Sequence, residues 1–281
     1  MNNCTKWWIT LFFSFYLGLL SIASAQTKNN TTATSETADN TKEKDQLEFS
    51  HPLVTESISP DTKIRFTYLN SKINSLITSK TNVLELEYAP VPGFSIHLDV
   101  PYSTLKQRGT SSFSNLDNIE LTFKFANFAF ARHNVLLGYG IGFGLPTGND
   151  NKGIGSNHIL NIEPFLNGGY MWRKWEWTAY FTFSVPTYQR ENESIQSSLQ
   201  SRVTALYHLN NYWQLVSEFG NERDISRPSN QNNNYDLLEG FKYFPFGHKP
   251  WIIGAAVREP IGTNSDLNFQ WLLTLFYHFK D

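Results

Sequence analysis

An alternation of apolar side chains and glycines within the stretch from Val135 to Leu145 constrains the fold most strongly. Leucine, tyrosine, isoleucine and phenylalanine fill the odd positions from 137 to 145, and glycine fills the even positions from 138 to 144. A period of two indicates a β-strand, because successive side chains leave opposite faces of the backbone. A run of about eleven residues is also the length at which a tilted strand crosses a bilayer. A strand of an ordinary β-sandwich has the same pattern, so the rest of the chain must decide between the two.

The first 25 residues are predicted to be a secretory signal peptide. Lys6 supplies a positive n-region, and residues 7–22 form an apolar run broken only by small polar residues. Ala23-Ser24-Ala25 then matches the small-x-small pattern of a cleavage site before Gln26. A retained membrane anchor is the alternative, which the short run and the cleavage pattern disfavour. The single cysteine, Cys4, leaves with this peptide, so disulfides and cysteine-ligated zinc are not expected in the mature chain.

Residues 26–60 are predicted to be a periplasmic N-terminal segment. Up to about Gln46 the segment is rich in Asn, Thr, Ser, Lys and Glu and almost without apolar residues, which predicts disorder. A leader follows, with the sequence HPLVTES at 51–57 and Pro60 at its end. The third and largest unit is a β-barrel predicted over residues 61–281.

Twelve strand-like segments follow one another within this unit. They are predicted at about 63–70, 81–89, 94–102, 117–127, 134–145, 158–171, 175–186, 198–209, 212–220, 235–245, 250–259 and 266–279. Their connections alternate between long ones, such as 103–116 and 221–234, and tight turns, such as Arg173-Lys174 and Asn210-Asn211. A meander with long loops at one end and tight turns at the other is typical of a transmembrane antiparallel β-barrel. The predicted fold class is therefore all-β, with about twelve strands.

The alternation alone does not say which face of each strand is inward. Two features favour an apolar face turned outward to lipid. Aromatic residues, which total 22 Phe, 13 Tyr and 8 Trp, crowd the tight-turn end like an interfacial girdle. The last segment is apolar on one face and ends near Phe279, which is typical of the signal read by the outer-membrane barrel assembly machinery. In the segment 235–245, Glu239 shares a face with apolar residues, so a β-bulge or another register is expected there.

The leader HPLVTES, the PTGN-type loop with its GIG continuation at 146–155, and the order of the strands resemble one known family. It is the group of outer-membrane proteins described as MetA-pathway of phenol degradation, or simply as transporter. The resemblance covers about residues 48–281 and rests on motifs of moderate specificity. It implies a monomeric outer-membrane barrel that helps small, often aromatic, compounds to cross, and it carries over no catalytic or binding residue. The Asn-rich segment up to residue 46 departs from the family.

Motifs for catalysis, cofactors or nucleic acid are not recognised. The glycines of 138–144 lack the GxGxxG spacing of a nucleotide loop, and a formal net charge of −2 gives no basic footprint for nucleic acid. Ser156 with His158, and His97 with Asp99, are the nearest approaches to a hydrolase site, but neither pair has a third partner. The spacing of His and Glu suggests no metal site. The chain is therefore not expected to be an enzyme.

The functional residues expected from the sequence are polar side chains on the lumen face. The candidates are Glu85, Glu87, His97, Asp99, Glu120, Lys124, Glu163, Glu176, Arg202, Glu218 and Arg258. They are interpreted either as a salt-bridged network that fills the lumen or as the lining of a weakly cation-selective passage. The predicted function is the passage of small molecules across a Gram-negative outer membrane, through a passive pore or by lateral release. A closed structural or adhesive barrel that acts through its long loops is the alternative.

Overall fold

The computed structural model describes residues 47–73, 75–187, 197–225, 233–247, 250–262 and 267–279. This part of the chain forms thirteen β-strands and two short 3-10 helices, Ala131–His133 and Asp150–Lys152. The strands are β1 (Lys63–Lys72), β2 (Ile77–Val91), β3 (Phe94–Gln107), β4 (Phe113–Leu116), β5 (Glu120–Asn127), β6 (Val135–Gly144), β7 (Asn161–Trp172), β8 (Trp175–Pro186), β9 (Ser198–His208), β10 (Trp213–Asp224), β11 (Asn233–Tyr243), β12 (Trp251–Ile261) and β13 (Phe269–His278). In these ranges no helix has the length and apolar character needed to cross a membrane. The predicted signal peptide and the segment predicted to be disordered lie outside the described residues.

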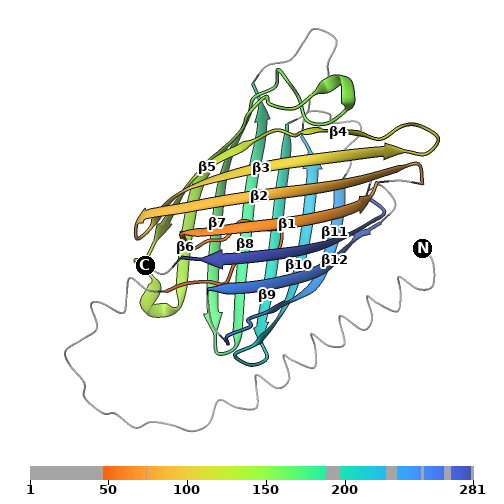
Figure 1. The fold of residues 1–281 in the computed structure, drawn as a ribbon. Coiled ribbons are helices and arrows are strands. Elements are labelled where there is room, and N and C mark those ends of the chain that lie inside the picture. Colours follow the sequence, from red (N-terminus) through yellow and green to blue (C-terminus); the bar gives the residue numbers. More distant parts are fainter. Residues whose placement is uncertain are drawn as a thin grey trace, which may run out of the picture. The chain divides into compact units, whose positions relative to one another are not determined.

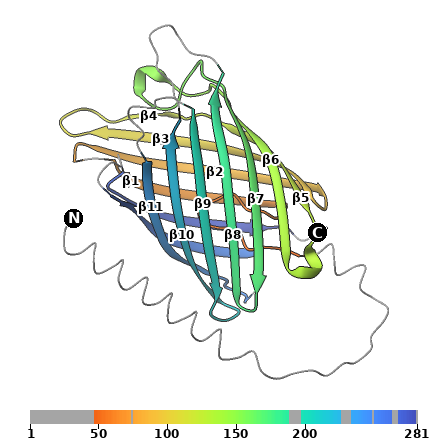
Figure 2. The ribbon, with the colours of Figure 1, turned by 180° about the vertical axis from the view of Figure 1, so that it is seen from behind.

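The strands close into a barrel. Neighbours in sequence pair antiparallel from β5 to β13, β13 pairs with β1, and β1–β2 and β2–β3 complete the ring. Both β4 and β5 pair with β3, at different parts of its length, so they form one wall position interrupted at residues 117–119. Figures 1 and 2 show the opposite walls, with β1–β3 nearer the viewer in the first and β6–β10 in the second. The predicted meander of twelve antiparallel strands is confirmed.

The apolar faces of the strands point out of the barrel. On β7, Leu166 is 64% exposed while its neighbour Asn167 is 7% exposed. The same inversion holds on β13, where Leu273 is exposed and Thr274 is buried. Alternation of this sense is the pattern of a barrel with a polar interior and an apolar outer surface. It confirms the orientation that the sequence favoured over a soluble barrel.

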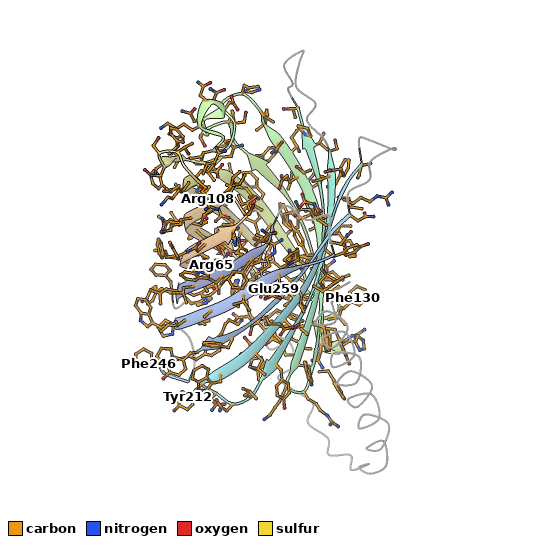
Figure 3. All side chains as sticks on the ribbon, turned by 90° about the vertical axis from the view of Figure 1, so that its right-hand side faces the viewer. Arg65, Arg108, Phe130, Tyr212, Phe246 and Glu259 are labelled. Atoms are coloured by element: carbon orange, nitrogen blue, oxygen red, sulfur yellow. The ribbon has the colours of Figure 1, made fainter. Side chains whose placement is uncertain are left out.

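Aromatic side chains gather at the tight-turn end. Trp213 packs against Tyr243 with ring centroids 4.7 Å apart, and Trp251 packs against Tyr277 at 4.8 Å. Figure 3 shows Tyr212 and Phe246 together at one end of the barrel, away from Arg108. The position of these rings matches the girdle predicted from the sequence.

Two predicted loops are largely strand. β1 and β2 extend to residues 72 and 77, and β3 continues to Gln107 and pairs with β4. Hydroxyl pairs connect these extensions: Thr81 Oγ1 lies 2.9 Å from Ser103 Oγ, and Thr104 Oγ1 lies 2.8 Å from Ser114 Oγ. Because the extensions are mostly polar, with isolated apolar residues such as Leu105 and Phe113, they show no sustained apolar alternation.

The bulge expected around Glu239 is wrong. β11 pairs with β10 from Tyr243 to Asn233 and with β12 from Tyr243 to Tyr235, and neither register shifts. The Glu239 side chain lies on the outer face, where its carboxylate accepts a hydrogen bond of 2.8 Å from Ser217 Oγ on β10. A hydroxyl partner on the neighbouring strand thus satisfies the carboxylate without a change of register.

Candidate functional site: a segment of the chain inside the barrel

Residues 47–61, here called the lumen segment, lie inside the barrel. Phe49, Leu53 and Ile58 are each at most 2% exposed, although their segment has no strand or helix of its own. Leu53 joins a cluster of inward apolar residues from β9 to β13, and Phe49 and Ile58 pack on Leu136 at the tight-turn end of β6. The sequence placed these residues ahead of the barrel and did not predict their position in the lumen.

Glu218 on β10 is the strongest anchor of the lumen segment. Its carboxylate accepts hydrogen bonds from the backbone N–H groups of Leu53 at 2.7 Å, Val54 at 3.1 Å and Thr55 at 3.1 Å. The Thr55 hydroxyl donates a fourth at 2.5 Å. Consecutive N–H groups that converge on one anion form a nest, and hydrogen bonds to an ionised acceptor are the stronger kind. Glu218 was predicted to face the lumen, but not to bind backbone.

Other wall residues complete the backbone hydrogen bonding of the segment. Glu176 accepts from the Ser50 N–H at 2.6 Å and from its hydroxyl at 2.8 Å. Lys242 donates to the His51 carbonyl at 2.6 Å, and Asn167 donates to the Ser57 carbonyl at 3.4 Å. An irregular backbone is tolerated inside a barrel only where such partners satisfy its polar groups. The wall is therefore chemically matched to this segment.

Glycines in the wall make room for its apolar side chains. A Cβ atom on Gly169 of β7 would lie 2.7 Å from the Phe49 ring. A Cβ atom on Gly240 or Gly254 would lie 2.9 Å or 2.7 Å from Leu53. Glycine inside a strand often marks the close approach of another part of the chain. These three lumen-facing glycines were the available sequence signal for a segment inside the barrel.

A network of ion pairs lies on the lumen face of β1, β2 and β5. Lys63 Nζ lies 2.8 Å from Glu85 Oε1 and 2.7 Å from Glu87 Oε2. Arg65 Nε is 2.6 Å from Glu85 Oε2, and Lys124 Nζ is 2.6 Å from Glu87 Oε1. Lys63, Glu87 and Lys124 are almost fully buried, and removing one partner of such a pair would leave an uncompensated charge. The predicted lumen residues on these strands are thus joined by ion pairs.

Glu56 of the lumen segment joins this network to β3. It lies 2.8 Å from Lys124 Nζ and 3.3 Å from His97 Nδ1, and His97 Nε2 lies 2.9 Å from Asp99 Oδ1. Burial opposes the ionisation of Glu56, yet the Lys124 ammonium and His97 hold the pKa of Glu56 well below its usual range. The ionised carboxylate therefore acts as a further anchor of the segment.

A second buried cluster lies where the lumen segment enters β1. His51 Nε2 is 3.2 Å from Asp61 Oδ2, and the same oxygen is 2.5 Å from His278 Nδ1 on β13. Lys63 Nζ lies 2.9 Å from His51 Nδ1. Burial and the Lys63 ammonium together lower the pKa of His51 well below its usual value. His51 is thus neutral while the segment is in place, and the sequence singled out none of these four residues.

The remaining predicted residues lie on the lumen face beyond the segment. Glu120 accepts a hydrogen bond from Thr122, and Glu163 accepts one from Ser184 at 2.8 Å. Arg202 and Arg258 converge on Asp236, with shortest distances of 2.8 Å and 2.7 Å. The role of Asp236 was not predicted, because Arg202 and Arg258, its two partners, lie on the other strands β9 and β12. All eleven candidates face the lumen, but the structure separates them into anchors, an acidic wall and an arginine pair.

The loop pair considered for hydrolysis lacks the geometry of a proton relay. Ser156 Oγ lies 3.2 Å from His158 Nδ1, and Asp150 Oδ2 lies 2.9 Å from the same nitrogen. A relay needs the hydroxyl and the carboxylate on opposite ring nitrogens. Ser156 Oγ also accepts the backbone N–H groups of His158 and Ile159. The arrangement shapes the loop rather than activating a nucleophile.

The fold and the site define a class: a closed, twelve-stranded antiparallel barrel of the outer-membrane type, with a charged lumen that holds a segment of its own chain. No protein-family model matches the chain, and no curated protein matches it.

Solved structures match over most of the chain. The "COG4313 outer membrane channel from Pseudomonas putida F1" is 14% identical, with a TM-score of 0.66 over 82% of this chain and 100% of that chain. The NanC porin is 7% identical, with a TM-score of 0.55 over 78% and 100%. The KdgM porin is 9% identical, with a TM-score of 0.50 over 78% and 99%. At these identities the likeness concerns the fold, and the MetA-pathway resemblance stays a prediction.

Proposed function

We propose that this chain is a Gram-negative outer-membrane channel for small molecules, and that the lumen segment closes it. Support comes from the fold shared with outer-membrane channels and porins and from the polar lumen. The proposal depends most on the observation that carboxylate, ammonium and hydroxyl groups of the wall and the segment hold the segment in place. Water can replace such partners as the segment withdraws, whereas an apolar core would have to be exposed.

The position of the segment suggests the route. The charges next to it are buried, whereas the side chains of Asp99 and Arg258 are 25% and 23% exposed. In this proposal a cavity that opens toward the long loops receives cargo, and withdrawal of residues 47–61 toward the tight-turn end lets it pass. Carboxylates outnumber cations on the lumen face, so the open pore should prefer cations.

The test is ion conductance of the mature chain in a planar bilayer, compared with Glu218→Gln/Lys242→Gln and with a chain lacking residues 26–46. The mature chain should be mostly closed, and the double variant should give discrete, cation-preferring steps. Steps that appear on removing residues 26–46 alone would assign the closure to that segment. A double variant that is silent but still folded, as judged by heat-modifiable gel mobility, would favour the closed structural or adhesive alternative.

Lateral release is the variant of this proposal that suits hydrophobic or aromatic cargo. The seam between β3 and β5 supports it, because Phe94–Asp99 pair with Glu120–Phe125 and the strand is then interrupted at residues 117–119, where the Asp117 N–H still donates to the Pro101 carbonyl at 2.9 Å. Ile96 and Phe123 lie opposite each other across the seam. A disulfide between cysteines at these two positions should block uptake of an aromatic solute and leave ion conductance unchanged. Equal uptake with and without the disulfide would remove the lateral route.

Localisation and assembly belong to the same proposal. Cleavage after Ala25 would deliver the chain to the periplasm, and the apolar face of β13 with Phe279 would be read by the barrel assembly machinery. Outer-membrane fractionation of the tagged chain tests this, with Phe279→Ala expected to reduce the folded fraction. A monomer is expected, since the closed ring leaves no unpaired strand edge.

A further inference from the structure

His97 occupies a position where two strands and the lumen segment meet. β2 and β3 pair so that Glu85 lies opposite Asp99 and Glu87 lies opposite His97. His97 and Asp99 are two residues apart on one strand, so both face the lumen. Glu85, His97 and Asp99 each offer one ligand atom, and these three atoms lie within 4.8 Å of one another.

Their separations suit a metal ion. His97 Nε2 lies 2.9 Å from Asp99 Oδ1 and 3.7 Å from Glu85 Oε1. A tetrahedral zinc ion with ligand bonds of about 2.0–2.2 Å needs its ligand atoms about 3.3 Å apart, which these two distances bracket. One imidazole with two carboxylates is a donor set that divalent transition metals accept, and it leaves a fourth position open.

The surroundings orient His97 for this role. Its ring is nearly buried, and Nδ1 lies 3.3 Å from Glu56 Oε2 of the lumen segment. A carboxylate behind the ring fixes the tautomer that presents Nε2 to a metal, an arrangement common around metal-binding histidines. The geometry therefore supplies both the ligands and the group that aligns one of them.

The charge balance leaves room for a cation at His97. The ion-pair network around His97 contains four carboxylates, Glu56, Glu85, Glu87 and Asp99, and three cations, Lys63, Arg65 and Lys124. One further positive charge, either a proton on His97 or a metal ion in its place, balances the network. Glu120 and Glu163 also lie on the lumen face, where Glu120 accepts a hydrogen bond from the Thr122 hydroxyl and Glu163 accepts one from the Ser184 hydroxyl. A divalent ion that replaces a proton on His97 would supply the missing positive charge.

Lys63 does not prevent binding. It shares Glu85 Oε1 at 2.8 Å but also holds Glu87 at 2.7 Å, so it keeps a carboxylate partner if Glu85 Oε1 binds an ion while Oε2 stays 2.6 Å from Arg65. The other cluster of histidines and a carboxylate is less suitable. There the Lys63 ammonium points at His51 Nδ1, so His51 Nε2 carries the proton that donates to Asp61.

We propose that Glu85, His97 and Asp99 bind a divalent transition-metal ion of the zinc type on the lumen face of β2 and β3. Glu56 aligns His97 from the lumen segment, so the bound ion also fastens that segment. Only this second consequence rests on the proposed channel function. All three residues were predicted to lie on the lumen face, but no metal site was predicted, because Glu85 joins His97 and Asp99 only through strand pairing.

The first experiment is calorimetric titration of Zn²⁺ into the EDTA-stripped mature chain in detergent. One site is expected, lost in His97→Asn and in Asp99→Asn, and retained in His278→Asn and in the loop variant His158→Asn. Glu56→Gln should weaken binding roughly 10- to 100-fold, as for other residues behind a metal-bound histidine. Equal binding by wild type and His97→Asn, loss in His278→Asn instead, or no binding would each overturn the proposal.

Conductance separates this proposal from the channel function. Zn²⁺ should lower the open probability of the wild-type channel and leave His97→Asn unaffected. Binding by calorimetry in a barrel that never conducts would retain the metal site and refute the channel. Conduction without Zn²⁺ binding would do the opposite.

Discussion

Replacing Glu218 by Gln tests most directly whether the wall holds the lumen segment. The carboxylate accepts two donors on each oxygen: the N–H groups of Leu53 and Val54 on Oε1, and the N–H and hydroxyl of Thr55 on Oε2. An amide NH₂ in place of either oxygen leaves two donors without an acceptor. The side-chain length is unchanged, so packing is preserved.

The expected loss follows from those hydrogen bonds. Each buried donor left without its charged acceptor costs about 1–3 kcal/mol, and a rotating hydroxyl recovers part of this, so we expect about 2–4 kcal/mol in all. At 1.4 kcal/mol per factor of ten, the withdrawn population should rise roughly 30- to 700-fold. Amide hydrogen exchange reports that population directly, because an N–H group exchanges when its protecting contact opens.

The assay is hydrogen exchange with mass spectrometry on peptides that span residues 47–61 of the mature chain. Glu222→Gln is the matched control, since Glu222 is on the same strand and its side chain accepts a hydrogen bond from Gln200. Exchange should accelerate in Glu218→Gln alone while the strands stay protected. Unchanged exchange at residues 53–55, or equal acceleration in the control, would refute the reasoning.

Three further predictions concern other parts of the site. Gly169→Ala places a Cβ against the Phe49 ring and should destabilise the bound segment by about 1–3 kcal/mol. In a Phe49→Ala background the same change should have little further effect. Equal amide hydrogen exchange of the segment in wild type and Gly169→Ala would contradict this. Burial and the nearby lysine keep His51 neutral in place, so its stabilisation is present above its ordinary pKa of ~6.5 and is lost as the pH falls through that value. Exchange of the segment should then rise by up to about tenfold per pH unit below ~6.5, and a His51→Gln variant should lack this slope. Substituting Ser156 and His158 together should leave lipid turnover at the wild-type level, and a drop would restore the hydrolase hypothesis.

The wall of the barrel could be predicted because each of its residues reports its own environment. A strand between an apolar and a polar phase alternates, so Leu137, Gly138 and Tyr139 already indicate two faces. The prediction failed where that contrast fades. Beyond Tyr102, β3 and β4 hold only Leu105, Phe113 and Leu116 as apolar residues, too few for a visible alternation, and Glu239 is polar on an apolar face.

The lumen segment could not be predicted in the same way. Its residues are Ser, Thr, His and Glu among a few apolar ones, a composition that suits a solvated tail. Its burial depends on partners such as Glu218, 165 positions from Leu53, and Glu176, 126 positions from Ser50. Alternation places both carboxylates in the lumen but does not say whether water or backbone satisfies them. The candidate residues were therefore located by the sequence while their roles were not.

Different interactions hold the wall and the lumen segment, and this explains how such a segment could close a channel without supporting the fold. Ten residue pairs join β1 to β13, and the ladder from β2 to β3 completes the ring, so the hydrogen bonds of the wall do not depend on residues 47–61. The segment is held instead by side chains that project from the wall, such as Glu218 and Lys242. Withdrawal would leave these groups to water, which solvates charges well, and the ladder would stay closed. Because backbone hydrogen bonds hold the barrel and side-chain contacts hold the lumen segment, the segment can leave and return while the wall stays intact.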